Sequence, residues 1–220
     1  TQVTEKRLRT GKRMGVLTAL FATLFTQNIQ ADEPQKFTDI VSITDATTSI
    51  SLGSHLQYFE DEEGKLNLQD VLTKKAEFKT SESDTPSFGF TQSAYWVFTE
   101  LHNSGSRSRS LILELDYPHH DTITLFEETA GQWSSGTTTG DLYNFDQRPI
   151  LHHNFLFPIS LDAGQRIKIG IRIQSTGSIQ VPLTLWDETS FHNFDSNRQL
   201  IYGVFFGLLL IMALYNLFLF

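Results

Sequence analysis

The chain has 220 residues, with 17 Lys and Arg against 25 Asp and Glu and a formal net charge of −8 at pH 7. Its 18 Phe, 6 Tyr and 3 Trp are ample for the core of one or two domains, and the lack of cysteine neither supports nor excludes an oxidising compartment. Residues 32–197 hold 24 acidic and 11 basic side chains, a surface that repels nucleic acid phosphates, so no nucleic-acid partner is expected.

The amino end has the pattern of a secretory signal peptide. Five basic residues precede an uncharged run from Met14 to Phe25, and the small residue Ala31 comes just before an acidic stretch. The uncharged run has 12 residues, too few for a helix to cross a bilayer. The sequence therefore predicts that residues 1–31 are a signal peptide and that the chain after them lies in the periplasm.

The hydrophobic pattern after the signal repeats every two residues, as in half-buried strands. In RIKIGIRI the apolar positions are Ile167, Ile169, Ile171 and Ile173. RSLILELD, NFLFPISL and SIQVPLTLW alternate in the same way, and AYWVFTELHN and DTITLFE are further strands separated by turn residues. This pattern predicts a mainly-β fold, an antiparallel jelly-roll sandwich that occupies residues 32–195.

Two helical segments accompany the strands. Residues 68–74 are expected to form a short helix capped by Asn67, and the stretch after Trp186 is expected to lead as a helix into an apolar segment. Residues 201–220 contain no charge and no proline, and at about 1.5 Å of rise per residue they cross a hydrocarbon core of about 30 Å. Residues 196–220 are therefore expected to be a connector and the first, truncated transmembrane helix.

The order of these stretches resembles a known family. AYWVFTELHN, LELDYPHHDTITLFE, TTGDLYNFDQRPILHHNFLFPISLDAG, IRIQSTGSIQVPLTLWDETSF and YGVFFGLLLIMALYNLFLF are similar to the extracellular domain of bacterial seven-transmembrane receptors with diverse intracellular signalling modules, followed by their first membrane helix. The resemblance covers about residues 50–220. It implies a periplasmic jelly roll similar to carbohydrate-binding modules, anchored in the bacterial inner membrane. It also implies a cytoplasmic output, such as a histidine kinase or a diguanylate cyclase, which this sequence does not contain.

The loop GDLYNFDQRP is the main candidate for a ligand-binding site. It contains Asp141, Tyr143 and Arg148, and sugar recognition combines planar polar side chains with aromatic faces. Gln180 and Trp186, near the end of the last predicted strand, add the same chemistry and complete the predicted site. The alternative is structural: Asp141 and Arg148 would pair and hold a long loop together. The residues alone leave both interpretations open.

DYPHHD and LHHN each contain two adjacent histidines, which raises the question of a metal site. Adjacent residues of a regular strand point to opposite faces, so neither pair chelates as a unit. We therefore expect DYPHHD to be a turn, in which Pro118 ends one strand and Asp121 bonds to loop backbone. Neither a metal nor another cofactor is expected.

Three functions remain to be weighed. The first, which we predict, is a sensor that binds a small periplasmic solute such as a carbohydrate and signals through residues 187–200 into the membrane helix. The second is a protein-interaction or dimerisation module with no solute ligand, which would form a homodimer or dock another envelope protein. The third, an enzyme, is disfavoured because the acids are scattered and no GxSxG, HExxH or phosphate-loop pattern occurs.

Overall fold

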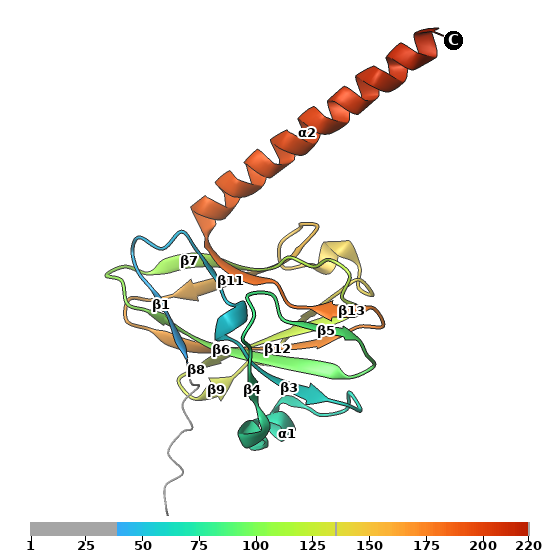
Figure 1. Ribbon diagram of the computed structural model, residues 1–220. Helices are drawn as coiled ribbons and strands as arrows, with labels where there is room; N and C mark the ends of the chain where they lie inside the picture. The colour runs from blue at the N-terminus through green and yellow to red at the C-terminus, as the bar shows by residue number, and fades with distance from the viewer. Residues whose placement is uncertain (1–38, 135, 220) are drawn as a thin grey trace, which may run out of the picture. The chain divides into compact units, whose positions relative to one another are not determined.

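The structure is a computed structural model that describes residues 39–134 and 136–219 (Figure 1). The predicted signal peptide, residues 1–31, lies outside the described residues. The described elements are, in chain order, β1 (Ile40–Ile43), β2 (Ser49–Ser51), η1 (Gly53–His55), β3 (Gln57–Asp61), α1 (Leu68–Thr73), η2 (Lys75–Glu77), β4 (Lys79–Thr80), β5 (Ser87–Phe90), β6 (Ala94–Asn103), β7 (Arg109–Leu115), β8 (Thr122–Thr129), β9 (Gln132–Trp133), β10 (Thr137–Thr139), η3 (Phe145–Gln147), β11 (Phe155–Leu161), β12 (Arg166–Gln174), β13 (Ser178–Gln180), β14 (Leu183–Asp187) and α2 (Glu188–Leu219).

Two main sheets form the sandwich. The eight-stranded sheet has the order β10-β8-β12-β6-β3-β4, with β1 added to β6 and β9 to β8, and the four-stranded sheet has the order β11-β7-β14-β2. β5 and β13 form a separate two-stranded sheet. Among the described strands every pair is antiparallel except β1 with β6. The predicted fold class, a mainly-β antiparallel sandwich of jelly-roll type followed by an apolar helix, is confirmed.

The core lies between these two sheets and follows the predicted alternation. In β12 the four isoleucines from Ile167 to Ile173 are at most 2% exposed. They share one cluster with Leu111, Leu113 and Leu115 of β7 and with the aromatic rings of β11. Because the isoleucines face inward, the alternate residues of β12, among them Arg172, lie on the outer face of the eight-stranded sheet.

The stretch SIQVPLTLW differs from the prediction. It is two strands in two different sheets, because β13 pairs with β5 and β14 pairs with β7 and β2. Pro182 lies between them and has no N–H to donate to a ladder, which is why a continuous strand breaks there. The predicted apolar positions are nevertheless buried, since Val181 and Leu183 are at most 1% exposed.

The short helix α1 begins as predicted at the residue after Asn67. The Asn67 side chain accepts a hydrogen bond from the Asp70 backbone N (3.0 Å), and the Asp70 side chain accepts one from the Asn67 backbone N (3.2 Å). This reciprocal capping box fixes the helix start. Leu68 and Val71 of α1 pack with Trp96, on the outer face of the eight-stranded sheet.

The helix α2 has 32 residues and is long and apolar enough to cross a membrane. Its first turns lie against the sandwich, where Phe191 is 2% and Asp195 8% exposed, whereas the residues from Ile201 onward are exposed. The predicted boundary between residues 195 and 196 therefore lies within a single helix.

Candidate functional site

The outer face of the eight-stranded sheet carries an aromatic cluster. The rings of Trp96 and Phe126 lie nearly parallel, with centroids 5.7 Å apart, and Trp133 meets Phe98 edge-on at 6.1 Å. Phe59, Phe78, Leu66 and the apolar side of α1 complete this cluster. Because Trp96 and Phe98 alternate along β6 with the core residues Tyr95 and Val97, one strand supplies two apolar layers.

Gly170 of β12 makes room for this cluster. It lies opposite Phe98 on β6 and Phe126 on β8. A Cβ atom at position 170 would lie 2.8 Å from Phe98 Cε1 and 3.3 Å from Trp133 Cζ3, closer than ordinary contacts. The missing side chain therefore lets the rings of Phe98 and Trp133 approach the sheet closely.

A pocket of about 360 Å³ opens between the aromatic cluster and the start of α1. Its lining residues are Leu66, Asn67, Leu68, Gln69, Trp96, Phe126, Trp133, Ser134 and Arg172. Trp96 is 1% exposed, and its Nε1 has no hydrogen-bond partner within residues 39–134 and 136–219. We refer to this site as the aromatic pocket. It combines ring faces, two side-chain amides and one cation.

Arg172 supplies the cation of the aromatic pocket. Its Nη2 donates hydrogen bonds to the Gly64 carbonyl and to Gln174 Oε1, both at 2.8 Å, and its guanidinium lies 5.9 Å from the Trp96 ring centre. Burial lowers the pKa of Arg172, while the charges of Asp61 and Tyr143 act in the opposite direction. Nη1 and Nε of Arg172 make no hydrogen bond to any described residue, so they remain available to an acceptor.

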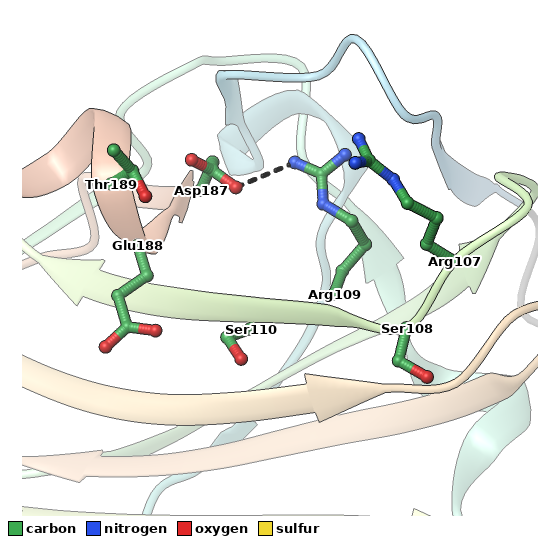
Figure 2. Close-up of a pocket in the computed structure, with 7 residues that line it drawn as sticks. All are labelled: Arg107, Ser108, Arg109, Ser110, Asp187, Glu188 and Thr189. Carbon is green, nitrogen blue, oxygen red and sulfur yellow. Dashed lines mark hydrogen bonds and ion pairs between the residues drawn. The ribbon is translucent and has the colours of Figure 1, made fainter.

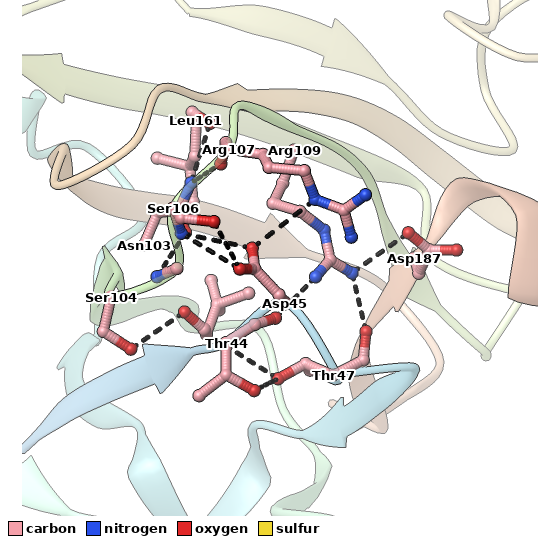
Figure 3. Close-up of polar contacts among 12 residues, drawn as sticks. Thr44, Asp45, Thr47, Asn103, Ser104, Ser106, Arg107, Arg109, Leu161 and Asp187 are labelled. Atoms are coloured by element: carbon pink, nitrogen blue, oxygen red, sulfur yellow. Dashed lines mark hydrogen bonds and ion pairs between the residues drawn. The ribbon is translucent and has the colours of Figure 1, made fainter.

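A second pocket, of about 330 Å³, lies where β14 becomes α2 (Figure 2). Arg109, 7% exposed in its side chain, donates to the carbonyls of Thr44 and Thr47 and to Asp187, at 2.5, 2.6 and 3.0 Å. Arg107 beside it is 70% exposed and lies 3.7 Å from Asp45 (Figure 3). The buried guanidinium thus joins the β1–β2 connection to the start of α2.

The outer face of the four-stranded sheet is the seat of α2. Ile112, Leu156, Phe191, Ile150 and Trp186 form an apolar cluster there. Beside it lies a polar network, in which Glu114, 3% exposed, accepts hydrogen bonds from Trp186 Nε1 (2.8 Å) and Asn154 Nδ2 (2.7 Å). Arg198 of α2 lies 3.8 Å from Glu114 and 2.7 Å from Asp195. We call these residues the helix seat.

Two of the predicted ligand-binding residues lie at the helix seat: Trp186 belongs to it, and Arg148 lies beside it. Trp186 gives its N–H to Glu114, and its ring stacks on Phe194 of α2 at 4.8 Å. Arg148 Nη1 donates to the carbonyls of His152 (2.6 Å) and His153 (2.9 Å). The predicted pairing of Arg148 with Asp141 is not formed, since no ion pair joins the two among the described residues. Arg148 instead holds carbonyls of its own loop.

The other three predicted residues lie elsewhere. Asp141 and Gln180 flank the fully buried His120, whose carbonyl accepts from Asp141 N and whose Nε2 lies 2.8 Å from the Gln180 carbonyl. Tyr143 is 39% exposed, and its backbone N donates to the Gly140 carbonyl at 3.2 Å. None of the five predicted residues lines the pockets described above.

The histidine-rich stretches behave as turn and packing residues. Asp121 accepts hydrogen bonds from the Thr176 backbone N (2.8 Å) and hydroxyl (2.9 Å), which lower its pKa. No group of three or more His, Asp or Glu side chains within the described part of the chain is placed to hold a metal ion.

Apart from Trp186, the residues that form the aromatic pocket and the helix seat are not among the site residues predicted from the sequence. One signal was available: the period of two places Arg172 opposite the isoleucines, and it separates Trp96 from Tyr95. Trp133, by contrast, lies in a two-residue strand, and Glu114 in an otherwise apolar stretch, where no pattern distinguishes them.

Comparison with known proteins gives one family. A family model described as 7TMR-DISM extracellular 2 matches residues 53–187, whereas no curated protein matches the chain. Among solved structures, a novel family GH115 4-O-methyl-α-glucuronidase with specificity for decorated arabinogalactans is 12% identical, over 65% of this chain and 18% of that chain, with a TM-score of 0.33. That likeness covers a small part of the enzyme and does not extend to its activity. The family match covers more than half of the chain, which therefore belongs to the 7TMR-DISM extracellular 2 family and contains the extracellular domain of a membrane receptor.

Proposed function

We propose that the chain is the periplasmic sensor of a receptor in the bacterial inner membrane. Residues 32–195 bind a small solute, a carbohydrate or a carboxylated relative of one, and pass the event to the membrane through α2. Residues 1–31 act as the signal peptide, and a cytoplasmic output domain follows the membrane helices. The proposed role of residues 32–195 and α2 is to bind a ligand and to transmit a signal, not to catalyse a reaction.

The aromatic pocket is the main support for the proposal that the domain binds a small solute. Sugar rings present a C–H face that packs on aromatic side chains and hydroxyls that pair with planar polar groups. Trp133 and Phe126 offer ring faces, Asn67 and Gln69 offer amides, and Arg172 has unused donors. The free donors of a partly buried guanidinium favour a ligand that carries a carboxylate.

The helix seat supports the transmission step. A ligand shifts a receptor only by its difference in affinity between two states, so the two states must differ in how the sandwich contacts the helix. Charged and aromatic contacts hold the first turns of α2 to the four-stranded sheet, through Glu114, His152 and Trp186. Since α2 then continues without interruption to Leu219, a displacement at the seat reaches the membrane segment.

A ligand screen tests the solute proposal. The purified chain in detergent micelles is melted in the presence of neutral sugars, uronic acids and other small carboxylates. A true ligand at a hundredfold excess over its dissociation constant stabilises the fold by about 2.7 kcal/mol. Gln69→Ala should keep the melting temperature of the free protein, whereas Trp133→Leu should lower it because Trp133 packs on Phe98. Both variants should lose the ligand-induced stabilisation, while Gln132→Ala, an exposed neighbour outside the pocket, should keep both the melting temperature and the stabilisation. A ligand whose effect survives both pocket variants would refute the site.

Topology is tested separately. An alkaline phosphatase domain fused after Arg198 should be active, because residues before the span are proposed to lie in the periplasm. If the phosphatase fusion is inactive and a reporter that works only in the cytoplasm is active at the same position, the proposed localisation is wrong.

A further inference from the structure

The loop between β10 and β11 exposes apolar side chains. Leu142 is 76%, Phe145 53% and Leu151 64% exposed, within ten residues of chain. Single exposed apolar residues are normal on a soluble surface, whereas several together mark a contact with a partner or a membrane. We call residues 142–151 the apolar loop.

Hydrogen bonds and ring contacts hold the backbone of the apolar loop in one conformation. The turn η3 forms its middle, and backbone hydrogen bonds join Gln147 N to the Asn144 carbonyl and Arg148 N to the Phe145 carbonyl. The Arg148 guanidinium lies 4.8 Å from the Phe145 ring centre and 4.5 Å from that of the core residue Phe155. The same guanidinium holds the carbonyls of His152 and His153. The exposed side chains are therefore presented on a supported backbone.

The carboxyl end of the apolar loop is attached to α2. Ile150 packs in the cluster that contains Phe191. The His152 ring lies 5.7 Å from the Phe191 ring, and its Nε2 lies 3.2 Å from Asp195 Oδ1 and 3.4 Å from Arg198 Nη2. Leu151, between these two contacts, is thus fixed beside the helix at the level of residues 191–198.

That level coincides with the surface of the bilayer. Arg198 is the last charged residue of the helix, and the apolar stretch starts at Leu200. With about 1.5 Å of rise per residue, Arg198 lies about 3 Å and Asp195 about 7.5 Å before that stretch. The headgroup layer on each side of a bilayer is about 5–7.5 Å thick. His152, which contacts both residues, and Leu151 next to it therefore lie at headgroup depth when α2 spans.

We propose that the apolar loop is a second membrane contact of this protein, with Leu142, Phe145 and Leu151 in the interfacial layer of the bilayer that α2 crosses. The occupant of this surface is phospholipid, because the loop is continuous with the helix that enters the membrane. Asp141 and Asp146 are the acids on and beside the loop, so the contact depends on apolar burial and not on anionic lipids. Such a contact fixes the tilt of the sandwich relative to the bilayer, which a single spanning helix does not fix.

The experiment uses the full chain reconstituted in phosphatidylcholine vesicles. Because the sequence contains no cysteine, Leu142→Cys, Leu151→Cys and the control Gln132→Cys each place one environment-sensitive fluorophore. Gln132 is exposed on β9 of the eight-stranded sheet, whereas α2 packs on the four-stranded sheet. Fluorophores at 142 and 151 should show blue-shifted emission and lose intensity when lipids with a nitroxide near the headgroup are added, and the fluorophore at 132 should show neither change.

Two outcomes would overturn the proposal. Emission at 142 and 151 that matches position 132 means that the loop lies in water. A blue shift without quenching by the nitroxide lipids means that protein covers the loop, and disulfide cross-linking of Leu151→Cys between two chains would then identify a second copy. Melting temperatures equal to that of the unsubstituted chain show that the labelled variants are folded. The proposal is independent of the solute, since no ligand is present in the measurement.

Discussion

Arg109 and Asp187 form an ion pair, with Nη2 3.0 Å from Oδ1, at the residue where β14 becomes α2. The other carboxylate oxygen of Asp187 accepts hydrogen bonds from the backbone N and the hydroxyl of Ser190, in the first turn of the helix. One carboxylate therefore caps α2 and binds it to β7. Figure 2 shows its pair with Arg109.

Arg109→Met should lower the free energy of unfolding by about 3 kcal/mol, because it leaves the Thr44 and Thr47 carbonyls and the Asp187 carboxylate without their partner. The measurement is chemical denaturation in detergent micelles followed by tryptophan fluorescence. Arg107→Met is the matched control, since Arg107 is 70% exposed and should leave stability unchanged. Equal effects of the two substitutions would show that the buried pair does not stabilise the junction.

Glu114 and Arg198 should be energetically coupled across the helix seat. Glu114→Gln and Arg198→Gln, alone and combined, form a double-mutant cycle in which a coupling of about 0.5–3 kcal/mol is expected for contacting members of one buried network. The pair Lys65 and Glu63, with side chains 78% and 76% exposed, should give no measurable coupling in the same cycle. A coupling of zero for the first pair would mean that Glu114 stabilises the fold only through its hydrogen bonds with Trp186 and Asn154.

The two halves of the structure differ in how far the sequence predicts them. The isoleucines of β12 face a continuous core, so the period of two is visible without knowledge of the neighbours. The capping box of α1 is likewise local, because Asn67 and Asp70 are three residues apart. Such features depend on short-range geometry that any window of the sequence contains.

The sites depend on long-range contacts. Glu114 and Arg198 are 84 positions apart and meet only because α2 returns over the four-stranded sheet. The aromatic pocket unites β6, β8, β9, β12 and α1, so Trp133 and Arg172 have no common signal in the chain. Within the predicted loop the chemistry of Arg148 was recognised, but its partners proved to be nearby carbonyls, which are present at every position and leave no mark in a sequence.

Gly170→Ala should destabilise the fold by about 1–3 kcal/mol through overpacking. The added Cβ would lie 2.8 Å from Phe98 Cε1 and would push the ring toward Trp133. Near-ultraviolet circular dichroism, which reports ordered aromatic side chains, should weaken together with the melting temperature. Gly177→Ala is the control, because its nearest heavy atom would be 3.6 Å away; an equal loss there would exclude the clash as the cause.

His120 should make the fold less stable in mild acid. Burial lowers its pKa, an effect that outweighs the bond to the Gln180 carbonyl and the charge of Asp121. The unfolded chain therefore binds a proton near the ordinary histidine pKa of about 6.5, and the folded chain only at lower pH. Stability contributed by the neutral ring is fully present above about pH 6.5 and decreases as the pH falls below it.

The pKa of His153 is also lowered by burial, so its contribution has the same sign. His120→Gln keeps a donor for the Gln180 carbonyl and removes the titrating ring. Melting temperatures between pH 7 and 5 should fall less steeply for this variant than for the unsubstituted chain. Parallel curves would assign the acid sensitivity to other groups.

Arg148→Ala and Tyr143→Ala together decide whether the loop predicted from the sequence binds solute. Arg148 holds two carbonyls and contacts two rings, so its removal should destabilise the fold by about 1–3 kcal/mol whether or not a ligand is present. Tyr143 is 39% exposed, and no hydrogen bond or ring contact joins its side chain to another described residue, so its removal should leave the melting temperature unchanged. Ligand-induced stabilisation, measured with a compound identified in the screen, then separates the roles. If Tyr143→Ala alone loses that stabilisation, the loop borders the bound solute; if both variants retain it, the loop is structural and the predicted site is wrong.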